Sequence, residues 1–194
     1  HSDCIIALGV RFNDRVTGDR SKFASNARIV HIDVDGAELD KTVSAAAALR
    51  GDVKLTLKRL LPMVKKTEHS EWAKIVDGYK KYEKEIADKR DGMTPVNVLN
   101  TLNGYLKPNT PVATDVGQHQ MWAAQVLKFS KIRRFISSGG LGTMGFGMGA
   151  AIGAYAGTGE RTVLVTGDGS FGMNLNELAT AVSYRVPLVV LILN

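Results

Sequence analysis

The sequence predicts an α/β protein in which parallel strands alternate with helices. Short apolar runs of strand length alternate with stretches of helical periodicity, most regularly over residues 92–194. The runs are apolar throughout, which is typical of parallel strands covered on both faces. Asp115, Asp168 and Asn194 each end such a run, at the position where parallel sheets bind ligands. We expect a partial first unit over residues 1–62, a helical linker over 63–91 and a second unit over 92–194.

The first unit is expected to contain two strands and two helices. DCIIALGV predicts a strand that ends in a glycine turn, and Ile29–Asp33 predicts a second strand after a polar loop. Ala37–Leu49 is rich in alanine and predicts a helix. GDVKLTLKRLLPMV predicts a turn and another helix. The linker is rich in charged residues, and its apolar stripe comprises Trp72, Ile75, Val76, Tyr79 and Ile86.

The second unit begins with a helix, because Thr94 and Pro95 fit its N-cap and first position. Further strands are predicted within TPVATDVG, RRFISS, RTVLVTGDG and PLVVLILN, and helices within QHQMWAAQVL, TMGFGMGAAIGAYA and NLNELATAVSYR. Asn174 and Glu177 are spaced as a capping pair for the last helix. A right-handed crossover would make the last two strands parallel neighbours, with their polar ends at one edge.

Composition and charge restrict the class of protein. The 194 residues are 44% hydrophobic and 23% charged, an ordinary globular composition. No apolar run reaches the roughly 18 residues of a membrane span, so we expect no membrane partner. The net charge is +6, but acids are interleaved with the lysines of the linker, which favours a solvated helix face over a nucleic-acid site. Cys4 is the single cysteine and fits a reducing compartment. The chain begins inside an apolar run, so we expect its natural N-terminus to lie upstream.

Asp168 lies between two glycines at the end of an apolar run. Glycine allows positive φ and a close approach of a ligand to the backbone, so the N–H groups of Gly169 and Ser170 would be available to phosphate oxygens. A carboxylate, an amide oxygen and phosphate oxygens suit octahedral Mg²⁺. Asn194 follows Gly169 after 24 intervening residues and would offer that amide. The alternative is a solvated acid in a glycine turn.

A second glycine cluster, SSGGLGTMGFGMGAAIGA, contains the spacing Gly140-x-Gly142-x-x-Gly145. This spacing formally matches the dinucleotide fingerprint, but the acid expected about 20 residues further on is not well placed. A NAD-binding module therefore remains an alternative. Tight helix packing accounts for at least part of the cluster, over Gly149–Ala156.

A third stretch, TDVGQHQMWAAQ, places Gly117, Gln118 and His119 between a strand and the start of a helix. Backbone N–H groups at a helix start favour anions, so this is a candidate anion site. A lone histidine there is more often structural, and both interpretations stay open.

Together, the three stretches resemble one family. GDG, then 24 residues, then asparagine is the first part of the thiamine diphosphate and magnesium motif, which normally ends in two asparagines. With the other two stretches upstream, the chain resembles the large catalytic subunit of acetohydroxyacid (acetolactate) synthase. GVRFNDRVTG, IVHIDVDGAE and RGDVK are similar to that family's FAD-associated middle domain. The resemblance covers about Asp3–Asn194 and implies a fragment of a longer synthase that ends within its thiamine diphosphate-binding domain.

The resemblance implies thiamine diphosphate, Mg²⁺ and FAD as cofactors. Thiamine diphosphate would contact Val116, Gly117, Gln118, His119, Gly142, Thr143, Met144, Gly167, Asp168, Gly169 and Ser170. Met144 would be the catalytic side chain that supports the bent cofactor, a role suited to a large flexible apolar group. Asp168 would bind Mg²⁺, with Asn194 a weaker ligand because the usual one would be residue 195. FAD would border Gly9, Val10, Arg11, Phe12, Asn13, Asp33, Val34, Asp52 and Val53. Asn13 departs from the family, which commonly has aspartate there.

The implied activity is decarboxylation of pyruvate and its ligation to a second 2-ketoacid, pyruvate or 2-ketobutyrate, in branched-chain amino acid biosynthesis. Arg15 matches the arginine that receives the second acid's carboxylate, a task suited to a guanidinium group. The family's activating glutamate lies in another domain, so we expect residues 1–194 alone to be inactive.

The resemblance also implies partners and a compartment. We expect a homodimer or tetramer with the active site at the subunit interface, a small regulatory subunit, and a location in the bacterial cytoplasm or the plant plastid. The alternatives are another thiamine enzyme (pyruvate oxidase, glyoxylate carboligase or the FAD-free catabolic acetolactate synthase), and a non-catalytic domain for subunit association.

Overall fold

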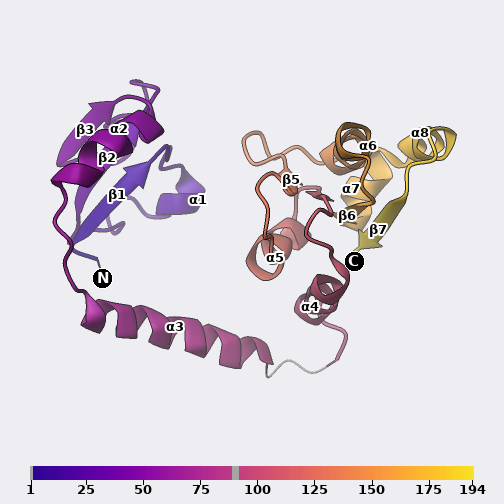
Figure 1. The fold of residues 1–194 in the computed structure, drawn as a ribbon, viewed down its shortest axis with the longest axis horizontal. Helices are drawn as coiled ribbons and strands as arrows, with labels where there is room; N and C mark the ends of the chain where they lie inside the picture. The colour runs from indigo at the N-terminus through magenta and orange to yellow at the C-terminus, as the bar shows by residue number, and fades with distance from the viewer. Residues whose placement is uncertain (1, 89–91) are drawn as a thin grey trace. The chain divides into compact units, whose positions relative to one another are not determined.

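The computed structural model describes residues 2–88 and 92–194 (Figure 1). It divides into two compact units, residues 1–71 and 72–194. Each unit contains a parallel sheet with helices, which confirms the predicted fold class. The finer division at residues 62 and 91 stays a prediction. Over the described residues, none of the helices has the length and apolar character needed to span a membrane.

The first unit is a three-stranded parallel sheet with the order β1-β2-β3. Its strands are β1 (Cys4–Leu8), β2 (Arg28–Asp33) and β3 (Ala47–Arg50), and its helices are α1 (Asp14–Thr17), α2 (Val53–Leu60) and the 3₁₀ turn η1 (Leu61–Met63). Ala7, Phe12 and Ile29 form the buried core of this unit. The two predicted strands and the helix after Asp52 are therefore confirmed.

The predicted helix over Ala37–Leu49 is wrong. The segment contains turns, and its last residues belong to β3, where Ala47 pairs with Val30 of β2. Alanine has a high helix propensity, but propensity is a weak preference that tertiary pairing overrides.

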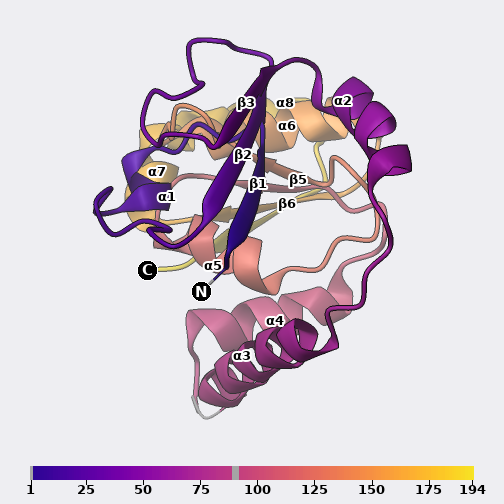
Figure 2. The same cartoon turned by 90° about the vertical axis from the view of Figure 1, so that its left-hand side faces the viewer.

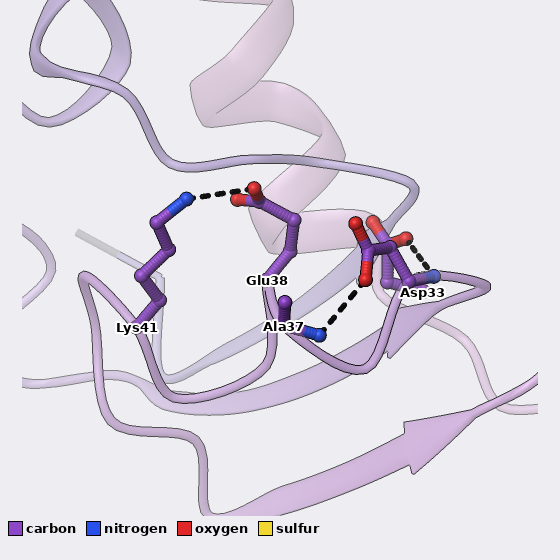
Figure 3. A network of polar contacts seen from close by, with 5 residues as sticks. Asp33, Ala37, Glu38 and Lys41 are labelled. Carbon is purple, nitrogen blue, oxygen red and sulfur yellow. Dashed lines mark hydrogen bonds and ion pairs between the residues drawn. The ribbon is translucent and has the colours of Figure 1, made fainter.

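Aspartate side chains explain why the chain after β2 forms turns instead of a helix. Asp33 Oδ1 accepts a hydrogen bond from the N–H of Asp35 at 2.8 Å, and Asp35 Oδ1 accepts one from the N–H of Ala37 at 2.9 Å (Figure 3). Lys41 pairs with Glu38 at 2.8 Å. Such local side-chain bonds compete with the backbone bonds of a helix, so this segment forms successive turns.

The charged linker is helical, as predicted: α3 covers Ser70–Asp88. In its apolar stripe, Trp72, Ile75 and Tyr79 are exposed and Val76 is half-buried. Ile86 lies outside the residues whose side chains the structure describes. The described part of the stripe is therefore mostly exposed.

The second unit is a four-stranded parallel sheet with the order β5-β4-β6-β7. Its strands are β4 (Val112–Thr114), β5 (Phe135–Ser137), β6 (Thr162–Thr166) and β7 (Leu188–Ile192). Its helices are α4 (Pro95–Tyr105), α5 (Gln118–Val126), α6 (Phe146–Thr158), α7 (Asp168–Met173) and α8 (Leu178–Ser183), with the 3₁₀ turn η2 (Leu175–Glu177). The side chain of Thr94 caps α4 by accepting from the N–H of Asn97 at 3.2 Å, as predicted.

Both faces of this sheet are covered. On one face Leu99 of α4 and Ala123 of α5 pack with Val163 and Val165 of β6. On the other face Met148 of α6 packs with Leu164. In Figure 2, α6 lies above the strands of this sheet and α5 below them. Two-sided burial explains why the strands are apolar throughout.

The capping pair predicted for the last helix is wrong. The chain becomes helical at Asp168, and Asn174 is both the C-cap of α7 and the N-cap residue of η2, where its side chain makes no capping bond. The side chain of Asn174 donates to the backbone carbonyl of Gly145, and the Glu177 carboxylate accepts from the hydroxyl of Thr180 at 2.8 Å. The connection between β6 and β7 thus contains two short helices and a 3₁₀ turn where one helix was expected.

Candidate functional site

The polar residues that follow the strands of the second unit lie at one edge of the sheet. Thr114, the last residue of β4, pairs with Val165, and Thr166, the last of β6, pairs with Ile192 of β7. Because the strands are parallel and in register, Asp115, Asp168 and Asn194 all follow at the carboxyl edge. The predicted placement of these three residues is confirmed.

A pocket of about 290 Å³ opens at this edge. Its lining includes ten of the predicted site residues: Val116, Gly117, Gln118, His119, Met144, Gly167, Asp168, Gly169, Ser170 and Asn194. Gly142 and Thr143 do not line it. Pro95, Trp122 and Leu193 also line the pocket and were not predicted. Trp122 lies one helical turn after Gln118 on α5, and this spacing is the sequence signal that would have found it.

His119 is held between two glycines. Its side chain is buried at 5% exposure. A Cβ placed on Gly117 would lie 2.8 Å from His119 Cε1, and one on Gly167 would lie 3.1 Å from Nδ1. The imidazole therefore occupies the space that side chains at these two positions would need, which explains glycine at both.

The buried imidazole has an unused polar atom. Nε2 of His119 is buried and has no hydrogen-bond partner among the described residues. Burial lowers the pKa of His119 from its ordinary value of 6.5, while the backbone carbonyl and the carboxylate of Asp115 act in the opposite direction. An unpartnered buried nitrogen in a pocket wall is suited to a polar ligand, because leaving it unpaired is costly.

Asp168 is the first residue of the short helix α7 and lines the pocket. The N–H of Phe171 bonds to the carbonyl of Gly167 at 2.9 Å, so the backbone amides of Gly169 and Ser170 belong to the first turn, whose N–H groups have no intrahelical acceptors. Asp168 is exposed. Asp168, Gly169 and Ser170 all line the pocket, an arrangement that suits a phosphate with a bound cation.

Gly167 and Gly169 do not adopt the positive φ that glycine allows. Gly167 has φ −100°, and Gly169 is not among the glycines with positive φ. Gly167 is required by the close approach of His119. The hydroxyl of Ser170 donates to the carbonyl of Val116 at 3.3 Å, which ties α7 to the strand-to-helix turn before α5.

The loop before α6 presents Met144 to the pocket. Gly142 and Gly145 have φ of +64° and +82°, where glycine is favoured. The N–H of Thr143 donates to Ser138 Oγ at 3.1 Å, so this residue shapes the loop. Met144 is 45% exposed, and its Cε lies 3.7 Å from the position of a Cβ on Gly169. Met144 is thus an apolar wall opposite the start of α7.

The glycines of α6 differ in their packing. A Cβ on Gly147 would lie 2.6 Å from Leu164 Cδ1 and 2.8 Å from the Asp115 carboxylate, whereas Cβ atoms on Gly149 and Gly153 would meet nothing within 4 Å. The expected tight packing over Gly149–Ala156 is therefore wrong for these two glycines and falls on Gly147, although Ala151 is fully buried.

In the first unit, the predicted FAD residues follow the ends of the strands. The N–H of Gly9 donates to the carbonyl of Ile32 at 2.9 Å, and the N–H of Gly51 donates to the carbonyl of Asp33 at 2.8 Å. Asp52 caps α2 through the N–H of Leu55 at 2.8 Å. These three chain segments therefore share one sheet edge.

Several of these residues have structural roles. Phe12 is 3% exposed and its ring stacks edge-on against His31 at 5.0 Å, so it belongs to the core. Asn13 caps α1 by accepting from the N–H of Val16 at 3.1 Å. Val34 is 71% exposed. Among the remaining predicted residues, Val10 and Val53 are half-buried, and Arg11 and Arg15 are exposed.

Metal binding at the pocket would depend on oxygen ligands. The described residues contain no group of three or more His, Cys, Asp and Glu side chains that would hold a metal ion. Asp168 and Asn194 line the same pocket, and a carboxylate and an amide oxygen fit a hard cation that completes its shell with ligand oxygens. These residues therefore fit Mg²⁺ bound together with a phosphate group.

Comparison with known proteins agrees with this geometry. The thiamine pyrophosphate enzyme central domain matches residues 1–60, and the thiamine pyrophosphate enzyme C-terminal TPP binding domain matches residues 115–194. The chain is 43% identical to the acetolactate synthase large subunit of Buchnera aphidicola subsp. Schizaphis graminum, over 100% of this chain and 35% of that protein. It is 39% identical to the acetolactate synthase isozyme 1 large subunit of Escherichia coli K12, with the same coverage.

The similarity extends to plants. The chain is 41% identical to acetolactate synthase 1, chloroplastic, of Nicotiana tabacum, over 100% of this chain and 30% of that protein. It thus spans about a third of the length of these curated relatives. With two domain models of one enzyme family in their expected order and relatives similar along its whole length, the chain belongs to the thiamine pyrophosphate (thiamine diphosphate) enzymes.

Proposed function

We propose that this chain is part of the catalytic subunit of an acetolactate synthase, which decarboxylates pyruvate and joins the two-carbon product to a second 2-ketoacid, pyruvate or 2-ketobutyrate. The observation that carries the proposal is the pocket at the carboxyl edge of the second sheet, where His119, Met144, Asp168 and Asn194 converge from separate segments. The names of the relatives supply the reaction.

The polar end of the pocket binds the diphosphate and its metal. Asp168 and the Asn194 amide provide oxygen ligands for Mg²⁺, and the amides of Gly169 and Ser170 donate to phosphate oxygens. Gln118 is exposed at the start of α5 and adds a side-chain donor. When Nε2 of His119 carries a proton, it donates a hydrogen bond to a phosphate oxygen. The last contact gives the buried, unpartnered nitrogen an acceptor.

The apolar part of the pocket holds the rings of the cofactor. Met144, Trp122 and Pro95 supply this surface. When bound, thiamine diphosphate supplies the site at which pyruvate loses carbon dioxide and the electrons are held. When the cofactor is bound, the residues of the pocket would orient it, and the apolar side chain of Met144 would support its rings. Placement of this kind contributes strongly to rate because it fixes the reacting atoms at attack distance.

The first unit contributes FAD and a substrate contact. FAD borders the predicted segments from Gly9 to Asn13, at Asp33–Val34 and at Asp52–Val53, and its role is structural because the net reaction involves no oxidation or reduction. Arg15, with an exposed side chain, receives the carboxylate of the second 2-ketoacid. A flavin-free but fully active full-length protein at saturating FAD would favour the catabolic acetolactate synthase instead.

The assembly and compartment follow from the same proposal. The enzyme is a homodimer or tetramer whose active sites are completed by a second subunit, with a small regulatory subunit as its partner. It works in branched-chain amino acid biosynthesis, in the cytoplasm of a bacterium or the plastid of a plant. Because the activating glutamate comes from another domain, residues 1–194 alone make no acetolactate.

A NAD-binding function is disfavoured by the sheet order. In the dinucleotide fold, the strand before the glycine loop neighbours the strand that carries the acid. Here β4 lies between β5 and β6, so the loop of Gly140 to Gly145 and Asp168 do not follow adjacent strands. NAD binding by the purified protein, without thiamine diphosphate binding, would overturn the proposal.

The deciding experiment compares acid variants in the full-length protein. Asp168→Asn removes the charge and keeps the size, so we expect it to abolish Mg²⁺-dependent binding of thiamine diphosphate, measured by calorimetry, and acetolactate formation from pyruvate. Asp77→Asn, at an exposed acid on α3, is the matched control and should behave as wild type. Equal cofactor binding by wild type and Asp168→Asn would refute the metal site.

A further inference from the structure

Asn174 contacts the backbone that carries Met144. Its side-chain amide donates to the carbonyl of Gly145, the residue that follows Met144 and caps α6. A Cβ on Gly145 would lie 3.2 Å from Met173 Cβ. The end of α7 and the start of α6 are therefore in close contact, and the hydrogen bond from the Asn174 side chain joins them.

The backbone around Met144 is also fixed by other bonds. Downstream, the N–H of Gly147 donates to Asp115 Oδ1 at 2.8 Å. Upstream, the N–H of Gly142 donates to the carbonyl of Ser138 at 2.9 Å. Met144 thus lies between two anchored segments. The N–H of Thr143 also donates to Ser138 Oγ at 3.1 Å. Without the Asn174 amide, the bonds at Thr143 and Gly147 would be separated by Met144, Gly145 and Phe146.

Helix α7 links Asn174 to the pocket wall. Its first residues, Asp168 and Gly169, line the pocket, and Met144 Cε lies 3.7 Å from a Cβ position on Gly169. The same six-residue helix therefore forms one wall at its start and holds the backbone of the opposite wall at its end. Because the helix is short, the two contacts are rigidly related.

We propose that Asn174 is a positioning residue that sets the distance between the Met144 side chain and the pocket wall at Gly169. The inference rests on the proposed function only in that Met144 is to contact the rings of the cofactor. Asn174 itself does not line the pocket and acts through Met144. Loss of its amide leaves the Gly145 carbonyl without this donor and releases the Met144 backbone.

The first test observes Met144 directly in the full-length protein without cofactor. Methyl-labelled methionine gives a resonance for Met144, assigned by its absence from Met144→Leu. Asn174→Ala and the equal-sized Asn174→Asp, which lacks the donor, should both shift this resonance. Asn176→Ala, at an exposed asparagine two residues on, should not. The resonance of Met148, which is 2% exposed, should stay unchanged in all variants and show that α6 is intact.

The second test measures turnover. Asn174→Ala should lower kcat by about tenfold, a loss typical of small misplacements in an active site, with the KM for pyruvate changed less than about twofold. In a Met144→Ala background the same substitution should change kcat by less than about twofold, because interacting residues are non-additive. An unmoved Met144 resonance, or an equal effect in both backgrounds, overturns the proposal. If the wild type makes no acetolactate, the proposed function fails, while the resonances still decide the role of Asn174.

Discussion

The hydroxyl of Thr166 donates a hydrogen bond to Asp115 Oδ2 at 2.8 Å, and both side chains are buried at 1% exposure or less. The other carboxylate oxygen accepts from the N–H of Gly147 at 2.8 Å. One carboxylate therefore joins the ends of β4 and β6 to the first turn of α6. Asp115 was predicted at the ligand edge, but its oxygens are used to hold that edge together.

Replacing Asp115 should destabilise the second unit. Asp115→Ala leaves the N–H of Gly147 without its acceptor, and a buried unpaired group costs about 1–3 kcal/mol. It also removes the acceptor of the Thr166 hydroxyl at 2.8 Å, which leaves that hydroxyl the carbonyl of Gly167 at 3.1 Å. We expect the full-length variant to unfold at a lower urea concentration than the wild type. Tryptophan fluorescence measures the midpoint. Thr166→Val removes one donor and should cost less. An Asp115→Ala midpoint equal to that of the wild type would contradict this account.

Two glycines of α6 should respond oppositely to alanine. Gly147→Ala brings a Cβ to 2.6 Å from Leu164 Cδ1, and such overpacking costs about 1–3 kcal/mol. Gly149→Ala adds a methyl group in open space and should stabilise the helix by about 0.5–1 kcal/mol. Thermal melting of the two variants measures the difference. Equal melting temperatures for the two variants would contradict the packing argument.

The space between Gly167 and His119 should control cofactor binding. In Gly167→Ala the new Cβ would lie 3.1 Å from His119 Nδ1, so the imidazole must move away and its Nε2 with it. We expect several-fold weaker binding of thiamine diphosphate with Mg²⁺ by calorimetry. Gly172→Ala, in the same helix with open space around it, should keep wild-type affinity. Equal losses in the two variants would point to a general effect on α7.

His119 should make stability depend on pH. Burial lowers its pKa in the folded state below the ordinary value of 6.5, so the unfolded chain binds a proton more readily than the folded one. The stabilisation is complete above pH 6.5 and is lost as the pH falls from there through the folded pKa. Urea midpoints from pH 8 to pH 5 should fall more steeply for wild type than for His119→Asn. Parallel curves would show that His119 does not carry this dependence.

The sequence was sufficient to predict which residues lie at the carboxyl edge of the second sheet. It was insufficient to predict the contacts between segments that meet there. Asp168 and Asn194 were correctly placed because they end apolar strands whose parallel order follows from chain handedness. The bond of Asn174 to Gly145 spans 29 residues, and Asn174 was predicted as a cap because its spacing to Glu177 is a purely local signal. Trp122 lines the pocket and was missed, although its position one helical turn after Gln118 is a signal in the sequence.

Local chemistry explains the other differences. The predicted helix after β2 failed because Asp33 and Asp35 bond to nearby N–H groups, an interaction that alanine content does not reveal. Gly147 and Gly149 are both helical glycines two residues apart, and the positions of Leu164 and Asp115 distinguish them. Sequence therefore identified the cluster but not its required member.

The imidazole of His119 between Gly117 and Gly167 also restricts the order in which this site can change during evolution. An alanine at either glycine is obstructed while the histidine is present, and a smaller residue at 119 leaves a gap beside both. A single substitution at any one of the three positions is therefore unfavourable. It can persist only if another substitution already offsets the clash or the gap that it creates. The three residues should be inherited together and should be replaced, where they are replaced, as a set.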